Sequence, residues 1–261
     1  MSKINQGVEY IKYLIRAFHL HGIHSPFVYQ LNEEVFQERT PFYCFDEIES
    51  IRAKLVLTKK TIGVDDFGAG SKKSSKYNRR ICDIAKTSIK RPKYSQLLYR
   101  LIYHFKPTTI LELGTSLGIS AAYMAKANPK AKVVSIEGAS ELSKVAEINC
   151  KKLSIDNLKL VSGNFDSTLE KELKSIGQLD FAFFDGNHKK EPTLNYFEHC
   201  LTYATEDSIF VFDDIYWSKE MTEAWKEIKK HPKVTITVDC FEMGVVFFKK
   251  EQAKEHFTVY H

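Results

Sequence analysis

The stretch "TTILELGTSLGIS", residues 108–120, decides the fold. It opens on β-branched and aliphatic residues, which favours a buried strand over 108–113. Gly114 and Gly118 follow at once and lead into "GISAAYMAKA" (118–127), a segment rich in good helix formers. A buried strand that passes through a glycine turn into a helix predicts the first unit of an α/β fold.

The same succession of strand and helix continues towards the C-terminus. Further strands are expected at 132–137, 158–163, 179–185 and 208–214, and helices at 141–153, 167–175, 192–203 and 219–230. Buried strands that alternate with helices predict a parallel, doubly wound sheet. The last two strands, 234–239 and 244–250, are joined too closely for a crossover helix, so they are expected to form an antiparallel hairpin. The prediction is a seven-stranded, Rossmann-like α/β domain over 88–261.

The N-terminal third carries a different signal. Apolar residues recur at helical spacing over 4–18, and Ser25 followed by Pro26 is typical of a helix start. Further helices are expected over 45–57 and 94–105. The segment "TIGVDDFGAGSKKSSKYNRR" (61–80) lacks periodicity and is interpreted as a long mobile loop, with "FGAGS" as a flexible turn. Residues 1–87 are therefore predicted to be a helical extension that covers the substrate.

Composition is ordinary for a globular protein, with 43% hydrophobic and 27% charged residues. No apolar run approaches the roughly 20 residues of a membrane span, and the N-terminus lacks the apolar centre of a signal peptide. A cytoplasmic location is expected, without membrane partners. Five cysteines are scattered singly, a pattern that favours reduced, buried thiols over a zinc site or disulfides.

The net charge of +5 is mild, but basic residues are concentrated between Ser71 and Lys93. The segment holds Lys72, Lys73, Lys76, Arg79, Arg80, Lys86, Lys90, Arg91 and Lys93. A solvated loop is the favoured interpretation. A surface for an anionic substrate or for nucleic acid is the alternative.

In an open α/β sheet, ligands bind at the carboxyl ends of the strands, so the residues that follow each strand carry the functional signal. The run Gly114-Thr115-Ser116-Leu117-Gly118 lacks the middle glycine of the dinucleotide fingerprint, which disfavours a nicotinamide dehydrogenase. Glu137 ends the second strand, where a carboxylate can accept both ribose hydroxyls. The two observations predict an adenosine-type ligand without pyrophosphate.

Carboxylates also follow two later strands. Asp185 ends "LDFAFFD", and Asp213 and Asp214 end "SIFVFDD". If these strands are neighbours, the three carboxylates converge, and converging carboxylates repel unless they are protonated or bind a cation. Oxygen ligands suit Mg²⁺ or another hard divalent ion. The alternative is that these residues only cap a helix or shape a turn.

Together these residues resemble the class I S-adenosylmethionine-dependent methyltransferases. "ELGTSLGIS" is similar to the first motif of the metal-dependent O-methyltransferases, such as the catechol and caffeoyl-CoA enzymes, and the likeness covers roughly residues 88–250. The resemblance implies that S-adenosylmethionine is the cofactor, with Gly114, Ser116 and Ser120 beside its methionine part and Glu137 on its ribose. Residues 162–165 ("SGNF") would border the adenine. The predicted cofactor-binding residues are Glu112, Gly114, Ser116, Gly118, Ser120, Glu137, Asn164, Phe165 and Asp185.

The same resemblance implies a metal and a base. Those relatives carry an Asp after the fourth strand and an Asp-Asn pair after the fifth, which correspond here to Asp185, Asp213 and Asp214. The second Asp departs from the catechol branch but is similar to macrocin-type enzymes. His188 stands at the offset where those relatives place a lysine base, and histidine performs proton transfer well. Asp185 and His188 are therefore the predicted catalytic residues.

The sequence thus predicts an S-adenosylmethionine-dependent methyltransferase that methylates a hydroxyl of a small molecule, with metal assistance as an expectation. One alternative is an RNA or protein methyltransferase that uses the basic segment 71–93. Another is a non-catalytic module that only binds the cofactor. The identity of the acceptor and the presence of a homodimer are left open by the sequence.

Overall fold

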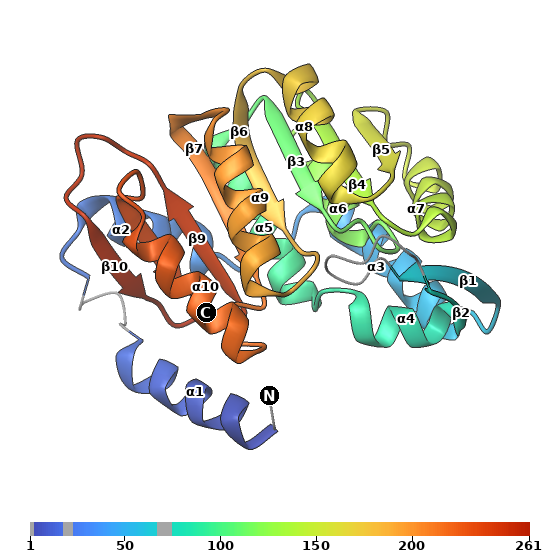
Figure 1. The fold of residues 1–261 in the computed structure, drawn as a ribbon, viewed down its shortest axis with the longest axis horizontal. Helices are drawn as coiled ribbons and strands as arrows, with labels where there is room; N and C mark the ends of the chain where they lie inside the picture. Colours follow the sequence, from blue (N-terminus) through green and yellow to red (C-terminus); the bar gives the residue numbers. More distant parts are fainter. Residues whose placement is uncertain (1–2, 18–22, 67–74) are drawn as a thin grey trace. The chain divides into compact units, whose positions relative to one another are not determined.

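A computed structural model describes residues 3–17, 23–66 and 75–261 of the chain. The chain groups into two compact units. We call them the central unit (Thr40–Gly177) and the split unit (Met1–Arg39 with Gln178–His261). Strands β3 to β10 make up an eight-stranded mixed sheet, and helices alternate with most of them along the chain (Figure 1). The predicted α/β, Rossmann-like class is confirmed.

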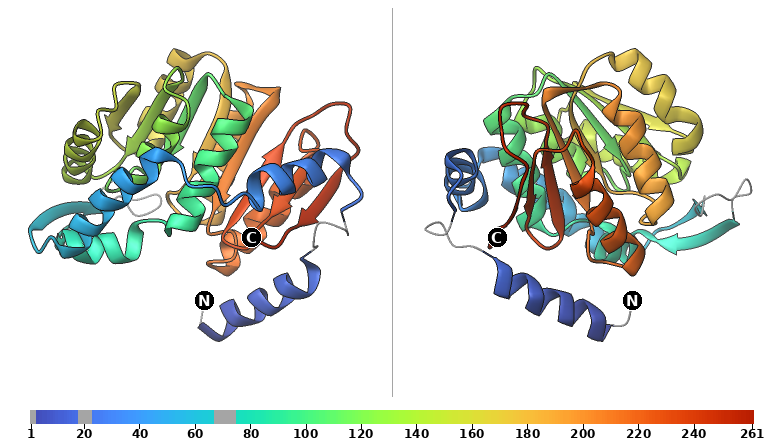
Figure 2. Two further views of the ribbon diagram at one scale, coloured as in Figure 1. Left: turned by 180° about the vertical axis from the view of Figure 1, so that it is seen from behind. Right: turned by 60° about the vertical axis from the view of Figure 1, so that its left-hand side comes forward.

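The central unit contributes three parallel strands in the order β3-β4-β5. They are β3 (Thr109–Leu113), β4 (Lys132–Glu137) and β5 (Leu158–Ser162). Each leads into a helix: α6 (Ile119–Ala127), α7 (Ser140–Lys152) and α8 (Phe165–Ile176). Figure 1 shows α8 in front of these strands, and the reverse view in Figure 2 shows α6 in front of them. Helices on both faces explain why β3 and β4 are almost continuously apolar.

The central unit also holds α3 (Tyr43–Leu57), α4 (Ile81–Ser88) and α5 (Pro92–Phe105). The expected loop over 61–80 is wrong in part: β1 (Thr61–Asp66) and β2 (Ser75–Arg80) pair as an antiparallel hairpin. The alternation in β1 is limited to Ile62 and Val64, both buried, while β2 consists mostly of charged and polar residues, so neither strand gave a clear signal. The segment "FGAGS" (67–71), for which a flexible turn is expected, lies outside the described residues, as do Lys72 and Lys73.

The split unit contributes five strands in the order β6-β7-β9-β8-β10. Strands β6 (Leu179–Phe184) and β7 (Ala204–Asp213) are parallel, and α9 (Lys190–Leu201) connects them. Helix α10 (Lys219–Lys230) packs beside α9 (Figure 1). The predicted closing hairpin is confirmed as β8 (Ile236–Asp239) and β9 (Met243–Phe247). A further strand, β10 (Glu255–Thr258), pairs with β8 and makes the sheet one strand larger than expected.

The N-terminal part of the split unit is helical, as predicted. It holds α1 (Lys3–Arg16) and α2 (Pro26–Leu31), which continues as a π-helical turn, Asn32–Phe36. The Ser25 side chain accepts the Val28 N–H at 3.4 Å, so the predicted cap is confirmed. The Tyr13 hydroxyl donates to the Val259 carbonyl at 2.7 Å and fastens α1 to the C-terminal segment.

The core of the split unit is aromatic and tightly packed. Trp225 on α10 is 1% exposed and lies against the backbone of β9, where a Cβ added at Gly244 would come within 2.5 Å of the indole. Glycine at this position therefore makes room for the indole. All five cysteines of the chain are buried, as the sequence predicts. Among the described residues, no helix is both long and apolar enough to cross a membrane.

Candidate active site

The predicted cofactor residues of the central unit end neighbouring strands. In the sheet register Leu113 pairs with Ile136, and Glu137 pairs with Ser162. The ladder continues one step further, because the Gly114 N–H donates to the Ile136 carbonyl and the Gly163 N–H donates to the Glu137 carbonyl, both at 2.9 Å. The residues after β3, β4 and β5 therefore lie along one edge of the central unit, where α/β folds bind ligands.

The loop between β3 and α6 needs its two glycines. Gly114 has φ +104° and Gly118 has φ +83°, in the region that side chains disfavour. A Cβ at Gly118 would also come within 2.9 Å of the Ala146 Cβ on α7. The helix start thus packs closely against its neighbour, as the sequence predicts. Ser116, between the glycines, also has a positive φ, at +49°.

Glu137 holds this loop through its carboxylate. One oxygen accepts the Ser116 N–H at 2.7 Å, and the other accepts the Ala139 N–H at 2.9 Å. Burial raises the pKa of Glu137, while these backbone donors oppose that shift. Each carboxylate oxygen has a second lone pair that can accept a ligand hydroxyl. The Ser116 Oγ is buried and has no hydrogen-bond partner among the described residues, so it suits a polar group of a ligand.

Glu112 and Ser120, two other predicted cofactor residues, are buried. Glu112 is 0% exposed and accepts a hydrogen bond from the Ser135 hydroxyl. Burial raises the pKa of Glu112 to about 7, and hydrogen bonds from Ser120 and Ser135 oppose that shift. Ser135 is a residue that sequence reasoning missed. Its signal was a hydroxyl in the middle of the otherwise apolar strand "KVVSIE".

Asn164 and Phe165 lie at the start of α8. The Asn164 side-chain oxygen accepts the Asp166 N–H at 2.9 Å and caps the helix. Phe165 is half-buried in the first turn. Asn164 therefore has a structural role, and its contact with an adenine, like that of Phe165, stays a prediction.

The predicted acidic residues belong to the split unit, and the register places two of them together. Phe184 on β6 pairs with Phe212 on β7, so Asp185 and Asp213 follow aligned positions on adjacent parallel strands. Asp213 is 1% exposed. Asp214 turns away from the strand with φ +53°, and its side chain is 26% exposed. The two neighbouring aspartates therefore differ: Asp213 is buried, whereas Asp214 lies on the turn and is partly exposed.

His188 lies between two of these carboxylates. Its Nε2 is 3.6 Å from the Asp185 Oδ1 and 4.0 Å from the Asp214 Oδ2. Asn187, to which the sequence assigned no role, has φ +55° and donates from its amide to the Tyr196 hydroxyl at 3.2 Å. Asn187 thus shapes the turn that presents His188.

The donor chemistry of this cluster suits a divalent ion, but the arrangement does not. Within the described parts of the chain, no three His, Cys, Asp or Glu side chains are grouped closely enough to hold a metal. The Asp185 and Asp214 carboxylates both approach the Nε2 of His188, at 3.6 and 4.0 Å. The buried Asp213 does not join them in a ligand set.

Two aromatic residues follow Asp214. The Tyr216 hydroxyl donates to Asp239, and burial raises the pKa of the phenol. The Trp217 side chain belongs to a residue that is 55% exposed, and the backbone N–H of Trp217 donates to the Asp214 carbonyl at 2.9 Å. The turn after β7 therefore presents an exposed indole next to the acidic cluster.

The basic segment of the central unit is spread over β2, α4 and the start of α5. Arg80 forms an ion pair with Asp83 at 2.8 Å, and Arg79 donates to the Thr87 hydroxyl at 3.0 Å. Lys86 and Lys93 are exposed. These positions are those of a solvated surface, in line with the favoured interpretation.

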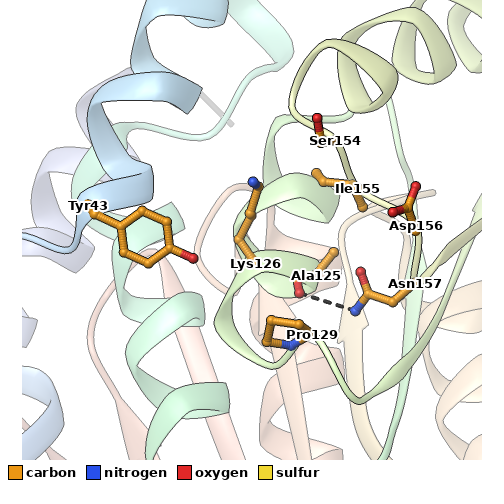
Figure 3. A pocket seen from close by; sticks show the side chains of 8 residues that line it. All are labelled: Tyr43, Ala125, Lys126, Pro129, Ser154, Ile155, Asp156 and Asn157. Atoms are coloured by element: carbon orange, nitrogen blue, oxygen red, sulfur yellow. Dashed lines mark hydrogen bonds between the residues drawn. The ribbon is translucent and has the colours of Figure 1, made fainter.

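Figure 3 shows a pocket of about 410 Å³ in the central unit. Its walls come from Tyr43, the end of α6 (Ala125, Lys126), Pro129 and the turn before β5 (154–157). These segments precede β4 and β5, so the pocket lies at the amino ends of the strands. It includes none of the predicted cofactor or catalytic residues.

Comparison with known proteins agrees with this geometry. Residues 111–215 match a family model described as a methyltransferase domain. No curated protein sequence matches the chain significantly.

Three solved structures share the fold. An O-methyltransferase from Bacillus cereus, solved in complex with SAH, is 17% identical with a TM-score of 0.56, over 84% of this chain and 96% of that one. The O-methyltransferase TomG from Streptomyces achromogenes, involved in tomaymycin synthesis and solved with SAM, is 18% identical with a TM-score of 0.55, over 62% and 82%. The SAH-bound methyltransferase PaMTH1 from Podospora anserina is 16% identical with a TM-score of 0.56, over 82% and 99%. Residues 111–215 are thus similar to a methyltransferase domain, and the chain shares the fold of these solved methyltransferases.

Proposed function

We propose that the chain is an S-adenosylmethionine-dependent O-methyltransferase that acts on a hydroxyl of a small molecule. The observation that carries the proposal is the Glu137 carboxylate, which holds the strained glycine loop by the Ser116 N–H at 2.7 Å. This arrangement leaves lone pairs for ribose hydroxyls beside a buried, unpartnered Ser116 hydroxyl. The solved neighbours with SAM or SAH support the same cofactor.

Residues of the central unit would hold the cofactor. Glu137 would accept the ribose hydroxyls, and Ser116 with the backbone of Gly114 would contact the methionine part. Close packing at Gly118 brings the N-terminal end of α6 near the ligand. When bound, S-adenosylmethionine supplies a methyl group already activated on a sulfonium, so the protein has to bind, orient and deprotonate the acceptor.

Residues of the split unit would prepare the acceptor. The Nε2 of His188 faces Asp185 and Asp214, so a proton on Nε2 leaves Nδ1 as the proton acceptor. The two carboxylates would stabilise the imidazolium that forms when Nδ1 takes the hydroxyl proton. The exposed Trp217 offers an apolar surface for the body of the acceptor.

A divalent ion at Asp185, Asp213 and Asp214 remains a separate hypothesis. The side chains as arranged do not form a ligand set, so the steps above use none of its chemistry. Turnover measured after chelation, and again after Mg²⁺ is added back, decides between the metal-free and the metal-assisted hypotheses. Activity that disappears with the chelator and returns with Mg²⁺ would establish the metal and overturn the metal-free steps.

The direct test of the proposal is isothermal titration with S-adenosylmethionine and with S-adenosylhomocysteine. We expect both to bind, and an absence of binding would contradict the proposed function. A methyl-transfer assay over catechols, other phenols and sugar hydroxyls then tests the acceptor class.

An RNA or protein acceptor at the basic segment 71–93 remains the alternative. RNA binding there would weaken steeply with salt, whereas binding of a neutral hydroxyl compound would not. The remaining expectations also belong to this proposal: a cap formed by residues 1–87, a methyltransferase domain over 88–261, a cytoplasmic location and a homodimer.

A further inference from the structure

Three buried polar side chains lie beneath the loop between β3 and α6. Thr115, Ser135 and Glu112 are 1%, 0% and 0% exposed. The Thr115 and Ser135 hydroxyl oxygens are 2.5 Å apart, and Ser135 also contacts the Glu112 Oε2. Buried polar groups are costly unless they are paired, and here each side chain forms a hydrogen bond with the next.

The direction of these hydrogen bonds follows from the number of protons. The bond between Ser135 and the Glu112 Oε2 has the serine as donor. A hydroxyl has one proton, so Ser135 has none left for Thr115. When the Glu112 Oε2 accepts from Ser135, Thr115 must therefore donate to Ser135. The order is then Thr115 to Ser135 to Glu112.

Strand β4 forms two side-chain contacts with the loop between β3 and α6. Ser135 and Glu137 are two residues apart on β4, and side chains at this spacing point to the same side of a strand. Ser135 contacts the side chain of Thr115, and Glu137 accepts the N–H of Ser116. Consecutive loop residues are thus tied to one face of β4. The two ties keep Ser116 at its positive φ of +49°, which a serine adopts at a cost.

We propose that the chain of hydrogen bonds Thr115–Ser135–Glu112 positions Ser116 for the amino-acid part of the methyl donor. The inference rests on the proposed function. Thr115, Ser135 and Glu112 are positioning residues in this view, because they act through the loop and leave the Ser116 hydroxyl free to bind the ligand. Ser135 is the central member, since it both accepts and donates.

Two substitutions of Thr115 separate hydrogen bonding from packing. Thr115→Val keeps the shape and removes the hydroxyl, whereas Thr115→Ser keeps the hydroxyl and removes the methyl group. We expect Thr115→Val to weaken S-adenosylhomocysteine binding about tenfold and Thr115→Ser to change it less than about threefold. If packing alone mattered, the order of the two variants would be reversed, and that result would overturn the proposal.

A second ligand makes the test specific for Ser116. 5′-Methylthioadenosine shares the nucleoside with S-adenosylhomocysteine but lacks the amino-acid part. In Thr115→Val its affinity should change less than about threefold. Equal loss for both ligands would indicate general damage to the site and would overturn the inference. Thr237→Val is the matched control, because it removes a buried hydroxyl, one bound to His256, from the split unit.

The measurements are made by titration calorimetry on the full chain, with thermal unfolding as the check of folding. If Thr115→Val does not fold, Ser135→Ala removes the central hydroxyl instead, with the same tenfold loss expected. Unchanged affinity in that variant would overturn the proposal. Failure of the wild-type protein to bind S-adenosylhomocysteine would contradict the proposed function itself, and is thereby distinguished from failure of the positioning role.

Discussion

The predicted site residues of the central unit and those of the split unit are held in different ways. In the central unit, backbone N–H groups and buried side chains hold the glycine loop with hydrogen bonds of 2.7–2.9 Å at Glu137. In the split unit, the ionic groups around His188 are 3.6–4.0 Å apart and stand on turns with positive φ. Under the proposed function, the short hydrogen bonds would keep the loop that binds the methyl donor rigid. The longer contacts around His188 would allow the acidic cluster to adapt to an acceptor.

The largest effect should come from the acidic cluster. His188→Ala should lower kcat about 1,000-fold, because a general base contributes roughly 100- to 10,000-fold. The affinity for S-adenosylmethionine should change less than about twofold. His199→Ala, an exposed histidine of the same unit, is the control. An unchanged kcat in His188→Ala would show that His188 is not the general base.

Burial of Glu112 should make stability depend on pH. The folded protein keeps Glu112 protonated up to about pH 7, whereas the unfolded chain ionises it near 4.5. The folded state then binds more protons between these values, so stability falls as pH rises through this window. One pKa unit corresponds to about 1.4 kcal/mol, so the contribution lost is about 3 kcal/mol.

Glu112→Gln should remove this slope. Denaturant unfolding at pH 5, 6, 7 and 8 gives the free energy of unfolding of wild type and variant. The difference between the two at each pH is the contribution of Glu112. Glu137 and Asp239, whose pKa values are also raised by burial, cancel in that difference. A difference that stays constant from pH 5 to 8 would contradict the elevated pKa of Glu112.

Glu137→Ala should lower the affinity for S-adenosylmethionine about 100-fold, because the loss of a charged hydrogen-bond partner is costly. The substitution removes the ribose acceptor and leaves the N–H groups of Ser116 and Ala139 without their acceptor. Calorimetric titration measures it, and Glu141→Ala, whose ion pair with Lys144 is exposed, is the control. An affinity within threefold of wild type would mean that the donor binds elsewhere.

The smallest effect separates backbone strain from steric overlap. Gly118→Ala meets both a positive φ and the Ala146 Cβ at 2.9 Å, while Gly177→Ala meets a positive φ in open space. We expect a loss of about 1 kcal/mol for Gly177→Ala and about 2 kcal/mol or more for Gly118→Ala. Denaturant unfolding measures both. Equal losses in the free energy of unfolding would show that α6 and α7 can move apart at Gly118 with little energetic cost.

Much of the fold was predictable because its signals are local. Apolar strands followed by glycine or acidic turns predicted β3, β6 and β7, and the short link between 239 and 244 predicted the closing hairpin. Strands β1, β2 and β10 were missed because they are short and carry many polar residues, and the only buried apolar side chains of β1 are Ile62 and Val64. Local sequence carries no sign of strands that depend on a partner.

The candidate site was predictable in its residues but not in its contacts. Sequence order placed Asp185 and Asp213 at aligned strand ends, and the register bears this out. It could not predict that Asp214, with its positive φ, brings its carboxylate to 4.0 Å from the His188 Nε2, because that depends on the backbone turn after β7. It did not predict that the Asn164 oxygen also caps α8, while the contact of Asn164 with a ligand stays a prediction. The sequence showed a serine in the middle of β4, but its hydrogen bonds to Thr115 and Glu112 depend on the pairing of β4 with β3, which the sequence does not give.

The two tryptophans of the chain differ sharply in surroundings: Trp225 is enclosed by the core, and Trp217 is exposed next to Asp214. Their fluorescence should therefore differ, with blue-shifted emission from Trp225 and red-shifted, easily quenched emission from Trp217. With Trp217→Phe as the reference, the red component becomes an optical signal for the turn after β7. Candidate acceptors can then be screened by quenching before any methyl transfer is measured.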